Sequence, residues 1–485
     1  MSRTALVILL LAAVFRIAPL ADDVRFHPDE ALFTSLARSV LTSGNWRLMG
    51  DLDKPPLSIY INAASLALIG VNNDRGVPDL DPHVGEFAAR LPGVLAGLLW
   101  VAAVYALAKR LYGNDTLAAW AALFMACAPP AIAYSAAAYT DGWMLAFSGL
   151  ALWMASADRP LTSGAFLAFA FLSKQQALYY LPLAFGFLLL PVSVNTRAAV
   201  IRRAALLLLP IAAAFGATAA WDALRRPSPP LFALAAANNS PGRLIRSDEV
   251  IPRLITWLEW GQFAVGAPTL FLTALSPLAV TWRVRRLTQT REAAADLLIV
   301  LFIVGYTFVH WLIAFNTYDR YLLPIVPMLA ILAARTGFWL WAMLSRWITR
   351  PELTVAAGAV VISLLTGARD THSIYNAERY EQGDIIALAD YLNALPTATI
   401  IYDHWLGWQL GYYLGAWNDK RRVYYPTADA LAADAVRLTE TEPRYFPAPA
   451  SQSFEVWREA LEGAGFVVER VYLAGSYTVY RLVPP

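Results

Sequence analysis

The sequence predicts a polytopic α-helical membrane protein that carries a small α/β domain toward its C-terminal end. Three observations lead to this prediction. The 485 residues are 58% hydrophobic and only 15% charged, whereas soluble globular domains carry about 25% charged residues. Apolar segments near the roughly 20 residues needed to cross a bilayer recur up to position 368. After position 370, segments with helical period alternate with short strand-like runs.

Eleven apolar segments are expected to cross the membrane. The first lies in MSRTALVILLLAAVFRIAPL, which resembles a signal peptide, but no small-residue cleavage motif follows it, so we expect a retained helix. Compact basic loops alternate along the chain, and the positive-inside rule assigns them to the cytoplasm. The odd number of spans then assigns the other loops and the C-terminal end to the outside. The spans run over roughly 4–20, 88–108, 117–135, 141–157, 161–174, 177–194, 204–223, 262–281, 297–315, 321–343 and 352–368.

The predicted membrane domain covers 1–368 and includes a first outer loop at about 21–87, and an extracytoplasmic α/β domain covers 369–485. In the second domain IIALADYLNAL has helical period, while ATIIYD, RRVYY, FVVERVYL and SYTVYRLV are typical of strands. The domain has no glycine-rich nucleotide-binding fingerprint.

Composition excludes several classes of protein. The net charge of +2 is too small to indicate a nucleic-acid partner. The single cysteine, Cys127, lies in an apolar run and excludes a disulfide within the chain. The five histidines show no metal-binding spacing, and His310, inside a predicted span, is expected to be a packed or hydrogen-bonded residue. Of the 38 basic residues only four are lysines, and Lys54 and Lys174 both fall on the predicted outer face.

The first outer loop contains HPDEALFTSLARSVL, which predicts an amphipathic helix lying along the membrane surface. Asp29 and Glu30 follow Pro28 in its first turn. Two interpretations stay open for these acids. They complement the helix dipole, as acids at a helix start commonly do, or they take part in catalysis. His27 is expected to be either a helix-capping neighbour of Asp29 or a supporting residue of the site.

The segment DLDKPPL at 51–57 predicts a second helix that begins at Pro55-Pro56. Its apolar run is too short for a normal span and indicates an interfacial or re-entrant helix. Lys54 directly precedes the positive end of this helix. That position is favourable if a phosphate binds there, because free N–H groups and an ammonium together attract an anion. The alternative is a solvated lysine paired with Asp51 or Asp53.

Five motifs occur in the order seen in the GT-C glycosyltransferases, and the chain most resembles the branch of protein O-mannosyltransferases and lipid A aminoarabinose transferases. The motifs are HPDEALFTSLAR, DKPPLSIY, AYTDGWMLAF, FLSKQQALYYLPLAF and YDRYLLPIVP. The resemblance covers about 1–345. It implies a glycosyltransferase that moves a sugar from a polyprenyl-phosphate donor to an acceptor hydroxyl on the extracytoplasmic face, with inversion.

The resemblance also implies roles for individual residues. The candidate catalytic residues are Asp29, Glu30 and Asp53. Asp29 matches the first-loop acid that acts as base or positions the acceptor, with Glu30 as its companion. Asp53 matches the acid before Lys-Pro-Pro, where glutamate is more typical. A divalent metal cation is the one cofactor considered, with Asp53 and Asp29 as candidate ligands. The donor-phosphate-binding residues are Lys54, Arg320, Tyr321, Lys174 and Arg38, and the supporting residues are Asp141 and His27.

The expected partners are the polyprenyl-phosphate-sugar donor, membrane lipids and an acceptor glycan, lipid or protein, in a bacterial inner or plasma membrane. Two other classes of function fit the sequence less well. A transporter or flippase of lipid-linked sugars would place its binding residues near the membrane midplane, often within repeats, whereas the charges here cluster in outer loops. A non-catalytic envelope scaffold would leave Asp29, Lys54 and Arg320 without a role.

Overall fold

The computed structural model describes residues 3–50, 52–70, 81–190, 196–226, 229–239, 242–286, 291–368, 382–438 and 441–485. These residues form two compact units. Unit 1 comprises 1–21, 47–61 and 90–374, and unit 2 comprises 22–46, 62–89 and 375–485. Unit 2 therefore joins much of the segment predicted as the first outer loop to the C-terminal residues. The predicted domain boundary after 368 borders residues 369–381, which lie outside the described part of the chain.

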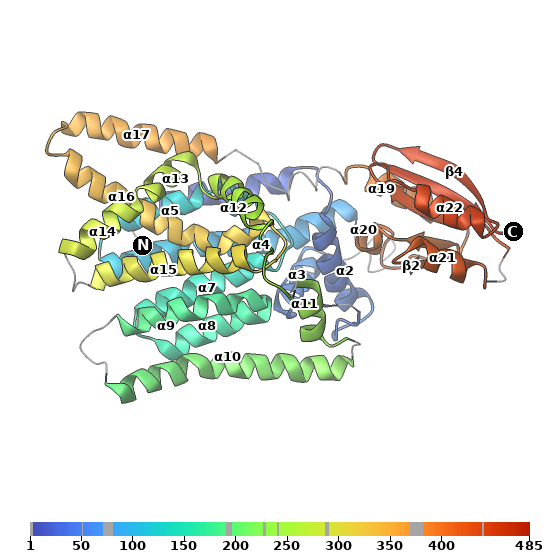
Figure 1. Cartoon of the computed structure of the whole chain (residues 1–485), viewed down its shortest axis with the longest axis horizontal. Coiled ribbons are helices and arrows are strands. Elements are labelled where there is room, and N and C mark those ends of the chain that lie inside the picture. The colour runs from blue at the N-terminus through green and yellow to red at the C-terminus, as the bar shows by residue number, and fades with distance from the viewer. Residues whose placement is uncertain are drawn as a thin grey trace. The chain divides into compact units, whose positions relative to one another are not determined.

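Unit 1 is a bundle of helices (Figure 1). Residues 57–61 of α3 and 90–112 of α4 belong to unit 1, and the rest of each helix belongs to unit 2. The helices α7, α8 and α10 lie side by side. The elements are α1 (Arg3–Ile17), η1 (Ala18–Ala21), α3 (Leu57–Ile69), α4 (Pro82–Tyr112), α5 (Asp115–Ala126), α6 (Pro129–Ala133), α7 (Asp141–Ser156), α8 (Pro160–Ser173), η2 (Gln175–Tyr180), α9 (Leu181–Leu189), α10 (Arg197–Arg225), α11 (Leu231–Asn239), α12 (Val250–Ala264), α13 (Ala267–Ala274), α14 (Ser276–Arg286), α15 (Arg291–Leu312), η4 (Asp319–Ile325), α16 (Val326–Leu344) and α17 (Arg350–Gly367).

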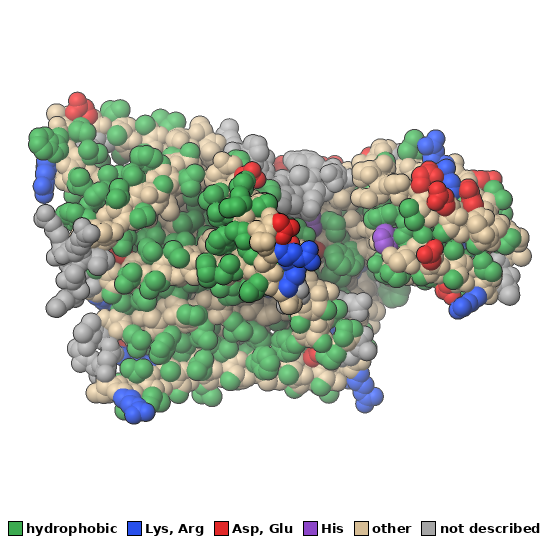
Figure 2. All heavy atoms as spheres, viewed as in Figure 1, with side chains coloured by type: hydrophobic (Ala, Val, Ile, Leu, Met, Phe, Trp, Pro, Cys, Tyr) green, Lys and Arg blue, Asp and Glu red, His purple; other side chains and the backbone are tan. Residues whose placement is uncertain are grey.

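Each of the eleven predicted spans overlaps one or more helices, although residues 191–194 of the span expected over 177–194 lie outside the described part of the chain. Five segments of the described chain are long and apolar enough to cross a membrane. Hydrophobic side chains are spread over the visible face of the bundle, with few charged side chains among them (Figure 2). These are the features of an integral membrane protein, whereas the count of eleven spans stays a prediction. The five segments are Arg3–Ala21, Pro82–Tyr112, Arg197–Arg225, Arg291–Leu312 and Asp319–Leu344.

Several of the other predicted spans are divided into shorter helices. The span expected over 117–135 ends as α5 at Ala126 and resumes as α6 at Pro129. The span expected over 262–281 is shared by α12, α13 and α14, with Pro268 and Pro277 near the breaks. Proline lacks the N–H that a continuous helix requires. The apolar pattern indicated that these regions are helical but did not reveal their interruptions.

Both helices of the predicted first outer loop are present. The helix α2 (Pro28–Thr42) begins at the predicted proline. The helix α3 begins at Leu57, two residues after the predicted start, because the Pro56 carbonyl accepts the first helical bond, from the Tyr60 N–H at 3.0 Å. Pro55 and Pro56 therefore lie immediately before the helix, and Lys54 precedes them.

The C-terminal part of unit 2 is the predicted α/β domain. Its sheet has the strand order β2-β1-β3-β5-β4; β1 pairs in parallel with β2 and β3, and β5 pairs antiparallel with β3 and β4. Tyr402, Phe446, Leu461 and Leu482 are buried in its core. The elements are α19 (Ile385–Asn393), β1 (Ile400–Asp403), α20 (Gly407–Tyr413), β2 (Arg421–Tyr424), α21 (Ala428–Ala435), β3 (Arg444–Pro449), α22 (Glu455–Gly463), β4 (Val467–Ala474) and β5 (Tyr477–Val483).

Candidate functional site

The segment before α3 holds an ion pair between adjacent residues. Lys54 Nζ lies 2.5 Å from Asp53 Oδ2, and the Asn239 side-chain amide donates to the same oxygen at 3.0 Å. The Gln175 side-chain amide donates to the Asp53 carbonyl at 2.6 Å. Burial opposes ionisation of Asp53, but the Lys54 charge and the hydrogen bonds outweigh it and lower the pKa of this carboxyl. Lys54 thus pairs with Asp53, as one interpretation predicted, but it is mostly buried rather than solvated. The alternative partner, Asp51, lies outside the described residues.

A second ion pair joins α7 to the residue that follows α8. Lys174 Nζ lies 2.7 Å from Asp141 Oδ1, and both side chains are only 5% exposed. Burial lowers the pKa of Lys174 to about 8, although Asp141 acts in the opposite direction. The positive charges of Arg320 and Lys54 also contribute to this lowering. Gln175, the neighbour of Lys174, contacts Asp53, the neighbour of Lys54, so the two lysines lie in one region of unit 1, and Arg320 is near enough to act on Lys174.

Arg320 lies on η4 among aromatic rings. The centre of its guanidinium is 5.2 Å from the Tyr139 ring, 5.1 Å from the Tyr318 ring and 5.9 Å from the Tyr321 ring. Such cation–π contacts hold a guanidinium in place while leaving its edge able to meet an anion. The preceding residue, Asp319, accepts bonds from the Tyr134 hydroxyl at 2.7 Å and from the Arg320 backbone N–H at 2.8 Å.

Four residues that sequence reasoning did not single out support these groups: Gln175, Asn239, Tyr134 and Asp319. Two of them had a sequence signal, because Gln175 follows Lys174 and Asp319 precedes Arg320 within predicted motifs. Asn239 ends an alanine-rich helix that carries no motif. Only the tertiary fold reveals that it meets Asp53.

In unit 2 the first turn of α2 forms a capping box. The His27 ring nitrogen Nδ1 accepts from the Asp29 backbone N–H at 3.1 Å, and Glu30 Oε2 accepts from the His27 backbone N–H at 3.0 Å. Glu30 is fully buried, whereas Asp29 is only half-buried. The geometry of His27 and Glu30 is that of a helix start. Asp29 is the acid of this turn with the more accessible carboxylate.

Arg38 lies on the side of α2 that contacts α20. One of its terminal nitrogens donates to the Gly411 carbonyl at 3.2 Å, and its guanidinium lies 4.7 Å from the centre of the Tyr412 ring. Its predicted role in phosphate binding stays a prediction. The predicted residues thus form two groups, each within one unit. Unit 1 holds Asp53, Lys54, Asp141, Lys174, Arg320 and Tyr321, and unit 2 holds His27, Asp29, Glu30 and Arg38.

His310 is buried in unit 1, as expected of a packed residue. Its ring stacks on Tyr306 with centroids 4.0 Å apart, and Nδ1 lies 2.9 Å from the Tyr306 carbonyl oxygen. Within the described ranges, no three His, Cys, Asp or Glu side chains are grouped so that they could hold a metal ion. Asp53, one of the two candidate ligands, instead directs Oδ2 at Lys54 and Asn239.

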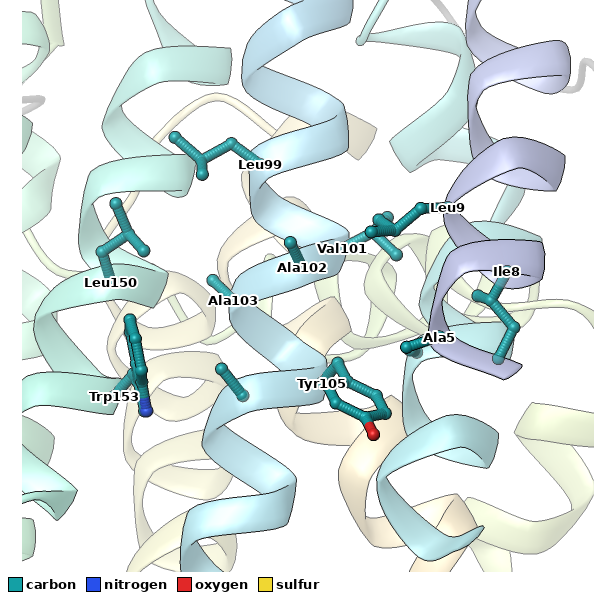
Figure 3. Close-up of a pocket in the computed structure, with 12 residues that line it drawn as sticks. Ala5, Ile8, Leu9, Leu99, Val101, Ala102, Ala103, Tyr105, Leu150 and Trp153 are labelled. Carbon is teal, nitrogen blue, oxygen red and sulfur yellow. The ribbon is translucent and has the colours of Figure 1, made fainter. Parts of the chain in front are cut away.

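An apolar cavity of about 270 Å³ lies elsewhere in unit 1 (Figure 3). Residues of α1, α4, α5 and α7 line it, among them Ile8, Ala103 and Trp153, and none of the lining residues is charged. The cavity therefore offers mainly apolar contacts, which suit a hydrocarbon chain, and no charged side chain for holding a phosphate.

Comparison with known proteins relates part of the chain to one sequence family. Residues 53–221 match the sequence model of the family described as dolichyl-phosphate-mannose-protein mannosyltransferase. An undecaprenyl phosphate-alpha-4-amino-4-deoxy-L-arabinose arabinosyl transferase from Erwinia tasmaniensis is 30% identical over 132 residues. That match covers 26% of this chain and 22% of the relative's length.

Solved structures show the same fold over most of the chain. ArnT from Cupriavidus metallidurans, bound to undecaprenyl phosphate, superposes with a TM-score of 0.64 at 15% identity and covers 98% of this chain and 97% of its own. The oligosaccharyltransferase of Archaeoglobus fulgidus in its apo form superposes with a TM-score of 0.58 at 11% identity, covering 96% of this chain and 69% of its own. These comparisons confirm the predicted GT-C-like fold, with its helical membrane part and its C-terminal sheet domain.

Proposed function

We propose that the chain is a glycosyltransferase that moves a sugar from a polyprenyl-phosphate donor to an acceptor hydroxyl, with inversion. The observation that supports this most is the grouping of Lys54, Lys174 and Arg320 in unit 1. Two of these cations lie within the segment that matches the mannosyltransferase family. A donor of this type carries one phosphate next to the bond that breaks, and fixed cations stabilise the charge that develops there.

The reaction needs three events. The acceptor hydroxyl gives its proton to the Asp29 carboxylate, which acts as general base. The acceptor oxygen then forms a bond to the anomeric carbon as the bond from that carbon to the phosphate oxygen breaks. The electron pair of the broken bond stays on the polyprenyl phosphate, whose charge becomes more negative by one. Lys54, Lys174 and Arg320 stabilise this leaving group.

Asp53 and Asp141 hold the lysines in place through their ion pairs, and Tyr321 forms part of the aromatic surround of Arg320. A divalent cation bound by Asp53 or Asp29 remains a prediction of the sequence. No step of the mechanism passes through it. Turnover that survives exhaustive chelation would remove the metal from the proposal.

The test of the proposal is Asp29→Asn. Loss of a general base lowers turnover by about 10²–10⁴-fold, and the carrier-binding residues of unit 1 are untouched. The product to follow is the sugar-modified envelope component that mass spectrometry finds missing from a deletion strain. Its rate of formation is measured after induced expression of each variant. Near-normal formation by Asp29→Asn would reject Asp29 as the base, and an unchanged envelope in the deletion strain would reject the transferase itself.

The active face and the C-terminal domain are proposed to be extracytoplasmic. On a Cys127→Ala background, a cysteine replacing the exposed Glu455 should react with an impermeant maleimide in intact cells. A cysteine replacing the exposed Arg346, in a predicted cytoplasmic loop, should react only after lysis. The opposite pattern would invert the proposed topology.

A further inference from the structure

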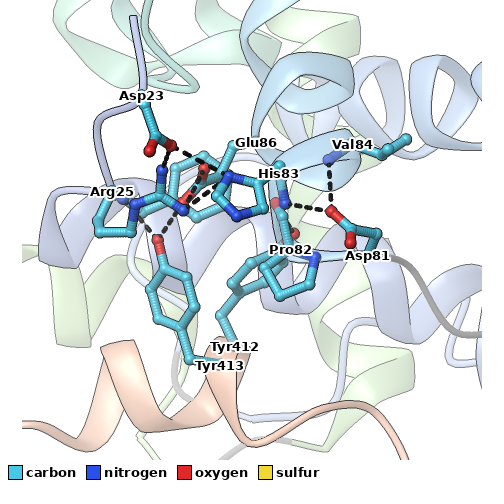
Figure 4. Close-up of polar contacts among 10 residues, drawn as sticks. Asp23, Arg25, Asp81, Pro82, His83, Val84, Glu86, Tyr412 and Tyr413 are labelled. Carbon is cyan, nitrogen blue, oxygen red and sulfur yellow. Dashed lines mark hydrogen bonds and ion pairs between the residues drawn. The ribbon is translucent and has the colours of Figure 1, made fainter. Parts of the chain in front are cut away.

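Unit 2 contains a buried polar cluster that the proposed chemistry does not use (Figure 4). Its centre is Tyr413, the last residue of α20 in the C-terminal domain. The Tyr413 hydroxyl donates to Glu86 Oε1 at 2.5 Å and accepts the Phe26 backbone N–H at 2.7 Å. One side chain of the C-terminal domain thus holds both the start of α4 and the residue before the cap of α2.

Charged groups complete the cluster. Arg25 pairs with Glu86 Oε2 at 3.2 Å, and both side chains are almost fully buried. Arg25 also contacts Asp23, and one of its terminal nitrogens donates to His83 Nδ1 at 3.0 Å. The Asp23 and His83 side chains are 79% and 55% exposed and form the outer edge of the cluster. Separating a buried ion pair strongly destabilises a fold, because it leaves a buried charge without its partner. The pair of Arg25 and Glu86 therefore constrains the backbone around Arg25 and Phe26.

The constraint reaches the candidate base through three successive residues. Phe26 is fixed by its N–H bond to Tyr413 and by its ring, which packs edge-on against Tyr412 with centroids 4.8 Å apart. His27 follows and caps α2, accepting the Asp29 N–H. Because the cap and the residue before it are both held, the first turn of α2 has little freedom to move, and this turn carries the Asp29 carboxylate.

The Tyr413 hydroxyl is protonated at physiological pH. Burial, followed by the negative charge of Glu86, raises the pKa of Tyr413 well above its ordinary value. The hydroxyl therefore keeps its proton and remains a donor to Glu86.

We infer that Tyr413 is a positioning residue for the reaction: through Glu86 and the Phe26 backbone, the C-terminal domain holds the first turn of α2 so that Asp29 stands ready to accept the acceptor's proton. This inference rests on the proposed role of Asp29. It gives the C-terminal domain a direct part in turnover, in addition to any part in folding.

The test uses Tyr413→Phe in the full chain, which keeps the ring and removes the hydroxyl. We expect faster hydrogen exchange in peptides covering residues 24–31 and a loss of product formation of about 10-fold to 100-fold, the range for a misplacement of about 1 Å. The affinity for undecaprenyl phosphate should stay unchanged. The matched control is Tyr425→Phe, a buried tyrosine of the same domain whose hydroxyl contacts Asp434, and it should change neither readout.

A double variant separates positioning from a general loss of structure. If Tyr413 acts through Asp29, the variant Tyr413→Phe/Asp29→Asn should be no slower than Asp29→Asn alone. Multiplying losses would overturn the inference, as would unchanged exchange or unchanged product formation in Tyr413→Phe. Normal activity in Asp29→Asn would reject Asp29 as the base. Hydrogen exchange in Tyr413→Phe would then still show whether Tyr413 holds the first turn of α2.

Should Tyr413→Phe fail to fold, Glu86→Gln replaces it. This variant keeps an oxygen for the Tyr413 hydroxyl and removes the charge that pairs with Arg25. We expect it to increase exchange over residues 24–31 and to slow product formation. Wild-type values for both would overturn the inference.

Discussion

Replacing Lys54 and Arg320 by alanine, singly and together, tests whether the two cations bind one phosphate. The loss of a hydrogen bond to a charged group costs about 1.5–3 kcal/mol, which corresponds to about 10-fold to 150-fold in affinity. The loss in Lys54→Ala should lie near the upper limit, because Lys54 is only 2.5 Å from Asp53 and its removal leaves that carboxylate facing the incoming phosphate. The guanidinium of Arg320 lies among three aromatic rings, and its loss should fall within the same range.

The double variant should lose less than the sum of the single losses, because residues that act on one group couple by about 0.5–3 kcal/mol. The measurement is a calorimetric titration of a short-chain polyprenyl phosphate into detergent-solubilised protein. Lys109→Ala is the matched control, since this lysine forms an exposed pair with Asp115 at 2.9 Å far along α4. Additive losses, or wild-type affinity in either single variant, would refute the shared phosphate.

Two further predictions concern the pair of Lys174 and Asp141. Lys174 caps the end of α8, at the outer boundary of the span predicted over 161–174, and its pKa of about 8 means that its amine loses its proton as pH rises through that value. Affinity for polyprenyl phosphate should therefore fall between pH 7 and pH 9, and Lys174→Arg should abolish the fall; an equal fall in both proteins would assign it to another group. Lys174→Met should lower the free energy of unfolding by about 3–5 kcal/mol, because it leaves a buried charge unpaired, whereas Lys174→Met/Asp141→Leu should recover most of it. Thermal unfolding in detergent measures this, and equal losses in the single and double variants would contradict it.

The sequence predicted features that depend on local chemistry. Pro28, followed by Asp29 and Glu30, indicated the start of α2. The two prolines after Lys54 indicated the start of α3 to within two residues. Such signals can be read from a single sequence, because a few neighbouring residues determine where a helix starts. The resemblance added the order of the motifs, and therefore the grouping of distant charges.

Features that depend on tertiary contacts were not predictable. Asn239 meets Asp53 across 186 positions of sequence, and Tyr134 meets Asp319 across 185. The strand β3 was also missed, since Pro447 and Pro449 argue against a strand in the interior of a sheet. The structure nevertheless pairs these prolines with Val479 and Tyr477 on β5. Neither kind of contact leaves a periodic signal in the chain.

The charges of the unit 1 site are nearly balanced before any ligand binds. Lys54 pairs with Asp53, Lys174 pairs with Asp141, and Asp319 directly precedes Arg320. A site with nearly balanced charges binds a phosphodiester, which carries one negative charge, with only modest electrostatic free energy. For the same reason, such a site can release the polyprenyl phosphate product, although this product carries one more negative charge. We therefore expect the carboxylates to limit phosphate affinity as well as to place the lysines.

Asp53→Asn tests this argument. The amide retains an oxygen beside Lys54 and removes one negative charge, so affinity for polyprenyl phosphate should rise by at least about 1 kcal/mol, the Coulomb energy of two unit charges 4 Å apart in water. Turnover should fall, because tighter binding of the product slows its release. The same titration measures affinity, and a pre-steady-state burst of product would identify release as the slow step. Unchanged or weaker affinity in Asp53→Asn would show that Asp53 does not restrain Lys54, and slower turnover without a burst would assign Asp53 to the chemical step instead.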